Sequence, residues 1–141
     1  MDFFFDTSAV FKLYIQEERS DVYAALLQES PLIYVSSLSW VEFHSALRLR
    51  VAQKHLTLRD REEVLHRFTQ DWKTFLQVEL KESVVHQAAQ FVTKHSLKAL
   101  DAIQLASAVE VSEVLGDPVA FLTADRQLDS AARREKLSTL P

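Results

Sequence analysis

The chain has 141 residues, 48% of them hydrophobic and 26% charged, which is typical of one globular domain over residues 1–141. It has no cysteine, which excludes disulfides and thiolate metal sites, and its single glycine cannot build a glycine-rich nucleotide-binding loop. The formal net charge of −4 argues against a broadly basic surface that binds nucleic acid. We expect a cytoplasmic protein, because the start lacks signal-peptide features and no uncharged run could span a membrane.

Short apolar runs alternate with amphipathic segments along the whole chain. Strands are predicted at residues 2–6, 32–36, 76–80 and 119–125. Helices are predicted at residues 7–18, 20–29, 39–55, 57–75, 82–97, 101–115 and 126–137. This alternation predicts a short parallel sheet covered on both faces by helices, a three-layer α/β/α sandwich.

Four acidic residues lie at junctions between these elements. Asp6 ends the first strand and Asp125 ends the last, while Glu42 and Asp101 lie at the starts of two helices. Ligands of an open parallel sheet bind beyond the carboxyl ends of its strands, so the four acids are expected to face one rim. Because they are far apart in sequence, only the fold could bring them together.

Each acid also has a simpler interpretation as a helix cap. Asp6 and Asp125 directly precede helices, where carboxylates accept backbone hydrogen bonds. The sequences Ser39-x-x-Glu42 and Asp101-x-x-Gln104 both match the spacing of a capping box. Capping and catalysis are compatible, since a helix N-terminus favours a carboxylate and holds it in place.

A cluster of these acids would be a metal site. Neighbouring carboxylates disfavour one another's ionised forms unless a cation lies among them. Oxygen ligands without histidine or cysteine suit Mg²⁺ or Mn²⁺, which can activate water and stabilise charge on a phosphodiester during hydrolysis. Basic residues follow two of the acids and could steer RNA phosphates, although each could equally belong to a solvated helix face: Arg48, Arg50, Lys54, Arg126, Arg133, Arg134 and Lys136.

Four sequence blocks resemble the signature blocks of PIN-domain proteins, and most of all the VapC-like ribonuclease toxins of bacterial toxin–antitoxin pairs. They are FFFDTSAVFKLYIQEE, SSLSWVEFHSALRLR, LKALDAIQLASA and AFLTADRQLDSAA, and they cover residues 2 to about 132 in the family's order. The second block is the least specific of the four. The resemblance implies a parallel-stranded α/β/α fold and an acidic site that cuts RNA with Mg²⁺ or Mn²⁺.

The family's acids correspond by motif to Asp6, Glu42, Asp101 and Asp125 as catalytic residues and metal ligands. Ser8 and Thr123 would support them, or they could be ordinary cap and turn residues. Gln104 stands where such sequences frequently have histidine, a departure that leaves the acids intact. The resemblance also implies an RNA substrate, a homodimer and a separate antitoxin that covers the site.

Three other classes of protein share features with this sequence. A receiver domain is also a small α/β protein, but it would show an acidic pair after the first strand and an acceptor aspartate after the third. A phosphatase with a D-x-D pair would need an acid where Ser8 stands. A PIN-like domain that only binds protein and has lost catalysis stays open, although all four acids are present.

Overall fold

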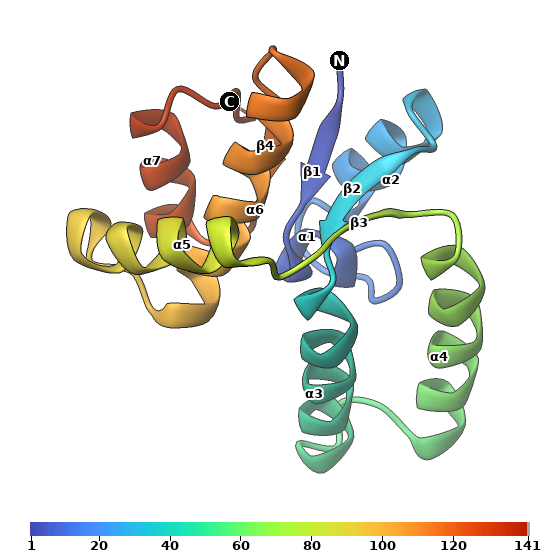
Figure 1. The fold of residues 1–141 in the computed structure, drawn as a ribbon. Helices are drawn as coiled ribbons and strands as arrows, with labels where there is room; N and C mark the ends of the chain where they lie inside the picture. Colours follow the sequence, from blue (N-terminus) through green and yellow to red (C-terminus); the bar gives the residue numbers. More distant parts are fainter. Residues whose placement is uncertain (141) are drawn as a thin grey trace.

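The computed structural model describes residues 1–140, and a four-stranded parallel sheet lies at its centre (Figure 1). The order across the sheet is β3-β2-β1-β4, so β1 lies between β2 and β4. This sheet confirms the predicted α/β class. The strands are β1 (Phe3–Phe5), β2 (Ile33–Ser36), β3 (Leu76–Val78) and β4 (Ala120–Leu122).

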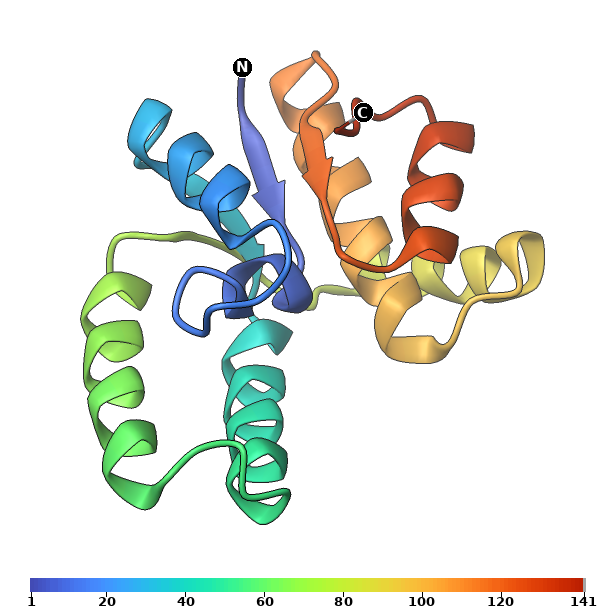
Figure 2. The ribbon, with the colours of Figure 1, turned by 180° about the vertical axis from the view of Figure 1, so that it is seen from behind.

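The helices connect successive parallel strands and cover both faces of the sheet (Figures 1 and 2). One side is formed by the first four helices and the other by the last three. The helices are α1 (Thr7–Phe11), α2 (Ser20–Glu29), α3 (Leu38–Ala52), α4 (Leu58–Trp72), α5 (Glu82–His95), α6 (Ala99–Leu115) and α7 (Arg126–Arg134).

The three phenylalanines of β1 face two separate cores. Side chains alternate along a strand, so Phe3 and Phe5 enter the core beneath α1 to α4, whereas Phe4 enters the core beneath α5 to α7. Phe4 stacks on Phe121 of β4 with ring centroids 5.7 Å apart. Burial on both faces therefore explains why this strand is apolar throughout, and it fixes the position of the residue that follows it.

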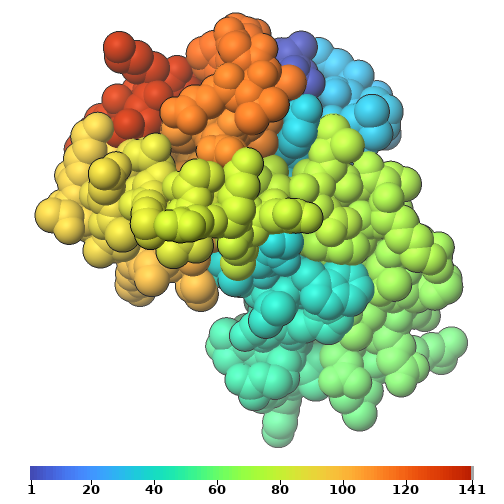
Figure 3. All heavy atoms as spheres, in the orientation of Figure 1, coloured from blue at the N-terminus to red at the C-terminus, as the bar shows by residue number. Residues whose placement is uncertain are grey.

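Helices α3 and α4 pair through aromatic side chains. The rings of Phe43 and Phe68 stack with centroids 3.8 Å apart, and the ring of Trp40 also stacks on Phe68, with centroids 5.4 Å apart. In the space-filling view this helix pair projects from the rest of the molecule (Figure 3). The pairing matters for the site because it holds the helix that carries Glu42.

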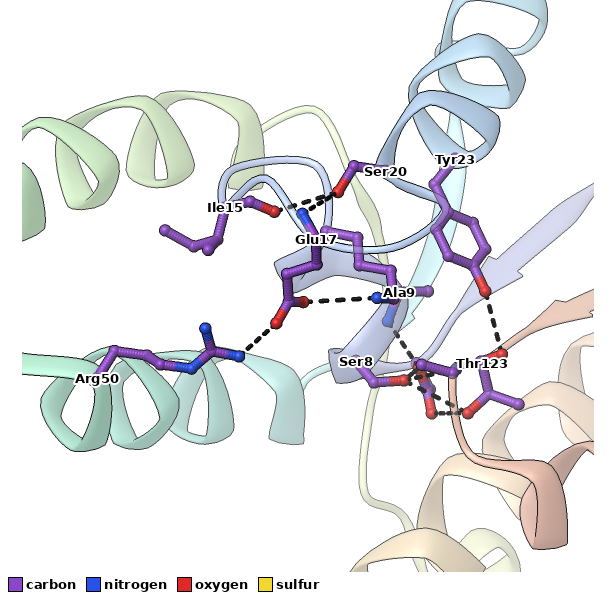
Figure 4. A network of polar contacts seen from close by, with 11 residues as sticks. Ser8, Ala9, Ile15, Glu17, Ser20, Tyr23, Arg50 and Thr123 are labelled. Atoms are coloured by element: carbon purple, nitrogen blue, oxygen red, sulfur yellow. Dashed lines mark hydrogen bonds and ion pairs between the residues drawn. The ribbon is translucent and has the colours of Figure 1, made fainter. Parts of the chain in front are cut away.

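The helix predicted at residues 7–18 ends at Phe11, so that boundary was wrong. After Phe11 the chain makes turns: the Ser20 hydroxyl donates to the Ile15 carbonyl at 3.2 Å and accepts from the Glu17 amide at 2.9 Å. The Glu17 carboxylate forms an ion pair with Arg50 of α3 (Figure 4). These non-helical contacts compete with continuation of the helix and fasten the loop to α3.

The helix predicted at residues 101–115 begins two residues earlier, at Ala99. Its N-cap is Lys98, which makes no side-chain capping bond. Asp101 is therefore the third residue of the helix, and the prediction that it could be a cap was wrong. Among residues 1–140, none of the helices is long and apolar enough to cross a membrane.

Candidate active site

Asp6 lies at the carboxyl end of β1 and is buried, with 4% of its surface exposed. Its Oδ1 accepts hydrogen bonds from the Ser8 hydroxyl at 2.6 Å and from the Ala9 amide at 2.9 Å. Its Oδ2 accepts one from the Thr123 hydroxyl at 2.5 Å. Asp6 is thus the N-cap of α1, as the simpler interpretation predicted, and its carboxylate is held in one orientation from three sides.

Ser8 and Thr123 connect Asp6 to the chain after β4. The Ser8 hydroxyl accepts from the Ala124 amide at 2.9 Å, and the Thr123 hydroxyl accepts from the Asp125 amide at 3.1 Å. The Thr123 carbonyl accepts from the Tyr23 hydroxyl of α2 at 3.1 Å. Figure 4 shows the side chains of Ser8 and Thr123 pointing toward one another from opposite sides. Two segments more than 100 residues apart are therefore joined at the end of the sheet.

Glu42 extends from α3 toward the same end of the sheet. Its Oε1 accepts hydrogen bonds from the Thr7 hydroxyl at 2.7 Å and from the Gln104 amide group at 2.8 Å. The capping box predicted from Ser39-x-x-Glu42 does not form, because α3 begins at Leu38 and Ser39 lies inside the helix. Glu42 is consequently oriented by other segments of the fold.

Asp125 is the N-cap of α7, and its Oδ1 accepts from the Leu128 amide at 2.9 Å. It is exposed, whereas Asp101 in the first turn of α6 is half-buried. Asp125 therefore combines the capping role that its position predicted with a carboxylate that solvent and ligands can reach.

The pKa values of Asp6 and Asp101 are both raised, chiefly by burial and further by neighbouring carboxylates. Burial raises the pKa of Asp6 to about 6, opposed by the hydrogen bonds from Ser8 and Thr123 and reinforced by the charge of Glu42. Burial also raises the pKa of Asp101, and the charges of Asp125 and Glu42 raise it further. The charge of Glu42 thus reaches both Asp6 and Asp101, and the charge of Asp125 reaches Asp101, so the ionised forms of Asp6 and Asp101 are disfavoured by neighbouring carboxylates as well as by burial.

The donor set fits a hard divalent cation. All four acids offer carboxylate oxygens, and one of the roughly four acceptor positions of Asp6 lacks a donor in residues 1–140. In that part of the chain no three His, Cys, Asp or Glu side chains already stand close enough to share one ion directly. Mg²⁺ typically takes one or two carboxylates directly and keeps several waters, so a cation here would contact one or two of the acids and reach the others through water.

Sequence reasoning missed the role of Gln104. This α6 side chain is 2% exposed, and its Nε2 lies 3.0 Å from the Thr7 hydroxyl and 3.1 Å from the Ser39 hydroxyl, in addition to Glu42. Its Oε1 is buried without a partner among the described residues. The available signal was a polar residue inside an otherwise apolar stretch of helix, which needs a hydrogen-bonding reason to be there.

Replacing Gln104 by leucine should weaken Mn²⁺ binding about tenfold, since the group that orients Glu42 would be lost. Isothermal titration of Mn²⁺ into the RNA-free protein measures this directly. Gln104→His keeps an N–H donor and should retain most of the affinity. An unchanged Mn²⁺ affinity in Gln104→Leu would show that the contact does not position Glu42 for a metal.

A groove runs past Glu42 on the outer side of α3. Its volume is about 810 Å³, and the polar side chains that line it are those of Thr7, Ser8, Lys12, Glu17, Glu42, Ser45 and Arg50. Val41 and Leu49 of α3 and Leu100 of α6 also line it and are 64%, 49% and 48% exposed. The acidic site is therefore continuous with an apolar surface that faces solvent.

Comparison with known proteins adds family and fold relationships. The model of a family described as PIN domain matches residues 3–134. Ribonuclease VapC45 of Mycobacterium tuberculosis (strain CDC 1551 / Oshkosh) is 30% identical over 130 residues, which are 92% of this chain and 88% of that protein.

Two solved structures have the same fold at low sequence identity. M. tuberculosis VapC20, described as a sarcin-ricin loop cleaving toxin, matches with a TM-score of 0.64 and 17% identity, covering 92% of this chain and 95% of that one. VapBC2 of Rickettsia felis, solved with a DNA fragment from its promoter, matches with a TM-score of 0.66 and 12% identity over 99% and 98%.

Proposed function

The chain belongs to the PIN-domain family, and we propose that it is an endoribonuclease that uses Mg²⁺ or Mn²⁺ at Asp6, Glu42, Asp101 and Asp125. The observation that supports this proposal is that Asp6 ends β1, Asp125 follows β4, and the pKa of Asp101 is raised by burial and by the charges of Asp125 and Glu42. Such a cluster is stabilised by a cation, and divalent-metal dependence is general among PIN-domain ribonucleases.

The residues of the chain would have distinct tasks. Asp6, fixed by Ser8 and Thr123, would supply a rigid oxygen ligand at the centre of the site. Asp101 and Asp125 would hold the cation from the α6 and α7 side, and Glu42 from the α3 side. When bound, the cation would acidify a water and neutralise charge on the phosphodiester. The burial of Asp6 would exclude bulk water from one side of the site.

We also propose that the chain is the toxin of a toxin–antitoxin pair. The support is its 30% identity to a VapC ribonuclease over nearly its full length. An antitoxin segment with apolar side chains would fit the groove lined by Val41, Leu49 and Leu100, which leads directly to Glu42. A homodimer is part of the same proposal, as the family resemblance implies.

The proposal is tested by incubating purified protein with a structured RNA and Mg²⁺ or Mn²⁺. Cleavage into discrete fragments is expected with either metal, and excess chelator should reduce it to background. Adding metal back beyond the chelator concentration should restore it. Fragments that form at the same rate with chelator present would contradict a metal-dependent nuclease.

A further inference from the structure

A second cavity adjoins the acidic site through Thr123, Ala124 and Asp125. Its volume is about 310 Å³, and residues 121–125, which comprise the end of β4 and the chain that follows it, are among its lining. Arg19 and Tyr23 come from the α2 side, whereas the α7 side contributes its first residue and later turns. Figure 2 shows this side of the molecule, with β4 running into α7. The cavity thus adjoins the acidic site, and it shares Lys12 and Ala124 with the groove beside Glu42.

Basic side chains line this cavity together with the acidic side chains of Glu18, Asp125 and Asp129; the basic ones are Lys12, Arg19, Arg126 and Arg133. Arg133 is occupied, since it donates to Asp129 at 3.0 Å and to the Leu140 carbonyl at 2.9 Å. Lys12 lies 3.6 Å from Glu17. Within residues 1–140, the side chains of Arg19 and Arg126 form no hydrogen bond and no ion pair. Two exposed guanidinium groups are therefore available at its walls.

Arg19 is held at the wall by an uncommon backbone conformation. It precedes α2 with φ at 67°, in the left-handed region that most L-residues avoid and glycine adopts readily. Its side chain makes no capping bond to the helix. Local folding therefore does not explain an arginine here, and a glycine would fit the backbone better.

We propose that this cavity binds phosphate groups of the RNA chain beside the bond that is cut, with Arg19 and Arg126 as the phosphate ligands. The proposal rests on the ribonuclease function proposed above. A guanidinium group matches the geometry of phosphate oxygens and stays charged at every physiological pH. The chain has a formal net charge of −4, and the carboxylates of its acidic site repel phosphate. Basic side chains nearby are therefore needed to hold RNA next to that site.

The test measures the binding of fluorescent 12-nucleotide RNA oligomers, one of uridine and one of adenosine, at several salt concentrations in the presence of Mg²⁺. All proteins carry Asp101→Asn, which prevents cleavage of the oligomers. Each of Arg19→Gly and Arg126→Ala should reduce the slope of log affinity against log salt by about 0.7, as expected for one phosphate contact to a single strand. Both oligomers should be affected equally, because phosphate contacts carry no sequence information.

Arg59→Ala is the matched control, since Arg59 is an exposed arginine of α4 that pairs with Glu63 and lies outside the cavity. Arg19→Gly relieves the left-handed backbone, so its thermal midpoint should not fall, and weaker RNA binding could not be attributed to unfolding. Salt slopes that stay at the Arg59→Ala value in both cavity variants would overturn the subsite.

A parallel titration with inorganic phosphate, followed by ³¹P NMR, distinguishes free phosphate from an RNA backbone. Arginine-dependent binding of phosphate with unchanged RNA slopes would also overturn the assignment to RNA.

Failure of the phosphate subsite can be distinguished from failure of the proposed nuclease function. Arginine-dependent RNA binding without cleavage by the wild type would leave the subsite standing and remove the nuclease function. Cleavage by the wild type with unchanged slopes would do the reverse.

Discussion

Asp101→Asn should reduce metal-dependent RNA cleavage about 100-fold or more, because one carboxylate of the acidic site is replaced by a neutral amide of the same size. The folded structure should survive the change. Asp101 is not the cap of α6, and its raised pKa means that its charge is disfavoured in the folded protein at neutral pH. The free energy of unfolding without metal should therefore stay the same or increase.

Cleavage rate and urea denaturation, measured on the same preparation, check both halves of this expectation. Asp117→Asn is a matched control, because Asp117 is exposed in the loop before β4, at the opposite end of that strand. Expression in bacteria gives a second readout: the wild type should arrest growth and Asp101→Asn should not. Equal cleavage by wild type and Asp101→Asn would point to a contaminating nuclease and remove the proposed site.

The metal-free protein should lose stability as the pH rises from about 4 to about 7. Asp6 has an ordinary pKa of 3.8 that burial raises to about 6, so the folded state binds its proton more tightly than the unfolded state does. The stability that Asp6 gains from binding its proton is fully present below its ordinary pKa of 3.8. This stability is lost as the pH rises through the raised pKa of about 6. The loss should be on the order of 3 kcal/mol in the free energy of unfolding.

Urea denaturation at closely spaced pH values measures this trend. Asp6→Asn should flatten it, since the amide oxygen can still accept from Ser8 and Ala9 while its nitrogen donates toward Thr123. Mn²⁺ should restore the stability of the wild type at pH 7 and have much less effect on Asp6→Asn. Asp60→Asn should keep the trend, because hydrogen bonds from Thr57 lower the pKa of that exposed acid. Stability that rises through this pH range would contradict the burial cost assigned to Asp6.

The sheet and most helices follow from the sequence because each rests on a local pattern. A strand buried on both faces must be apolar throughout, as β1 is, and the caps at Asp6 and Asp125 depend only on the next three residues. Glu42 and Asp101 matched capping spacings equally well, and both were misassigned as possible caps. Where a helix begins depends on packing across the molecule, which spacing alone does not encode.

Two features of the site could not be obtained from local patterns. The Gln104 amide contacts Thr7, Ser39 and Glu42, which come from two other helices, and nothing near Gln104 in sequence indicates them. Arg19 lines the cavity beside Asp125 only because the segment after α1 turns back instead of continuing as a helix. Long-range assembly of this kind is visible only in the folded chain.

The position of β1 between β2 and β4 bears on when the protein can become active during its synthesis. Asp6 leaves the ribosome 117 residues before Thr123, which fixes its second carboxylate oxygen. Domains fold as units, and contacts between distant segments must wait for the later one. A nascent chain that still lacks β4 thus has an incomplete acidic site, so translation itself delays the enzyme until the residues after β4 have emerged.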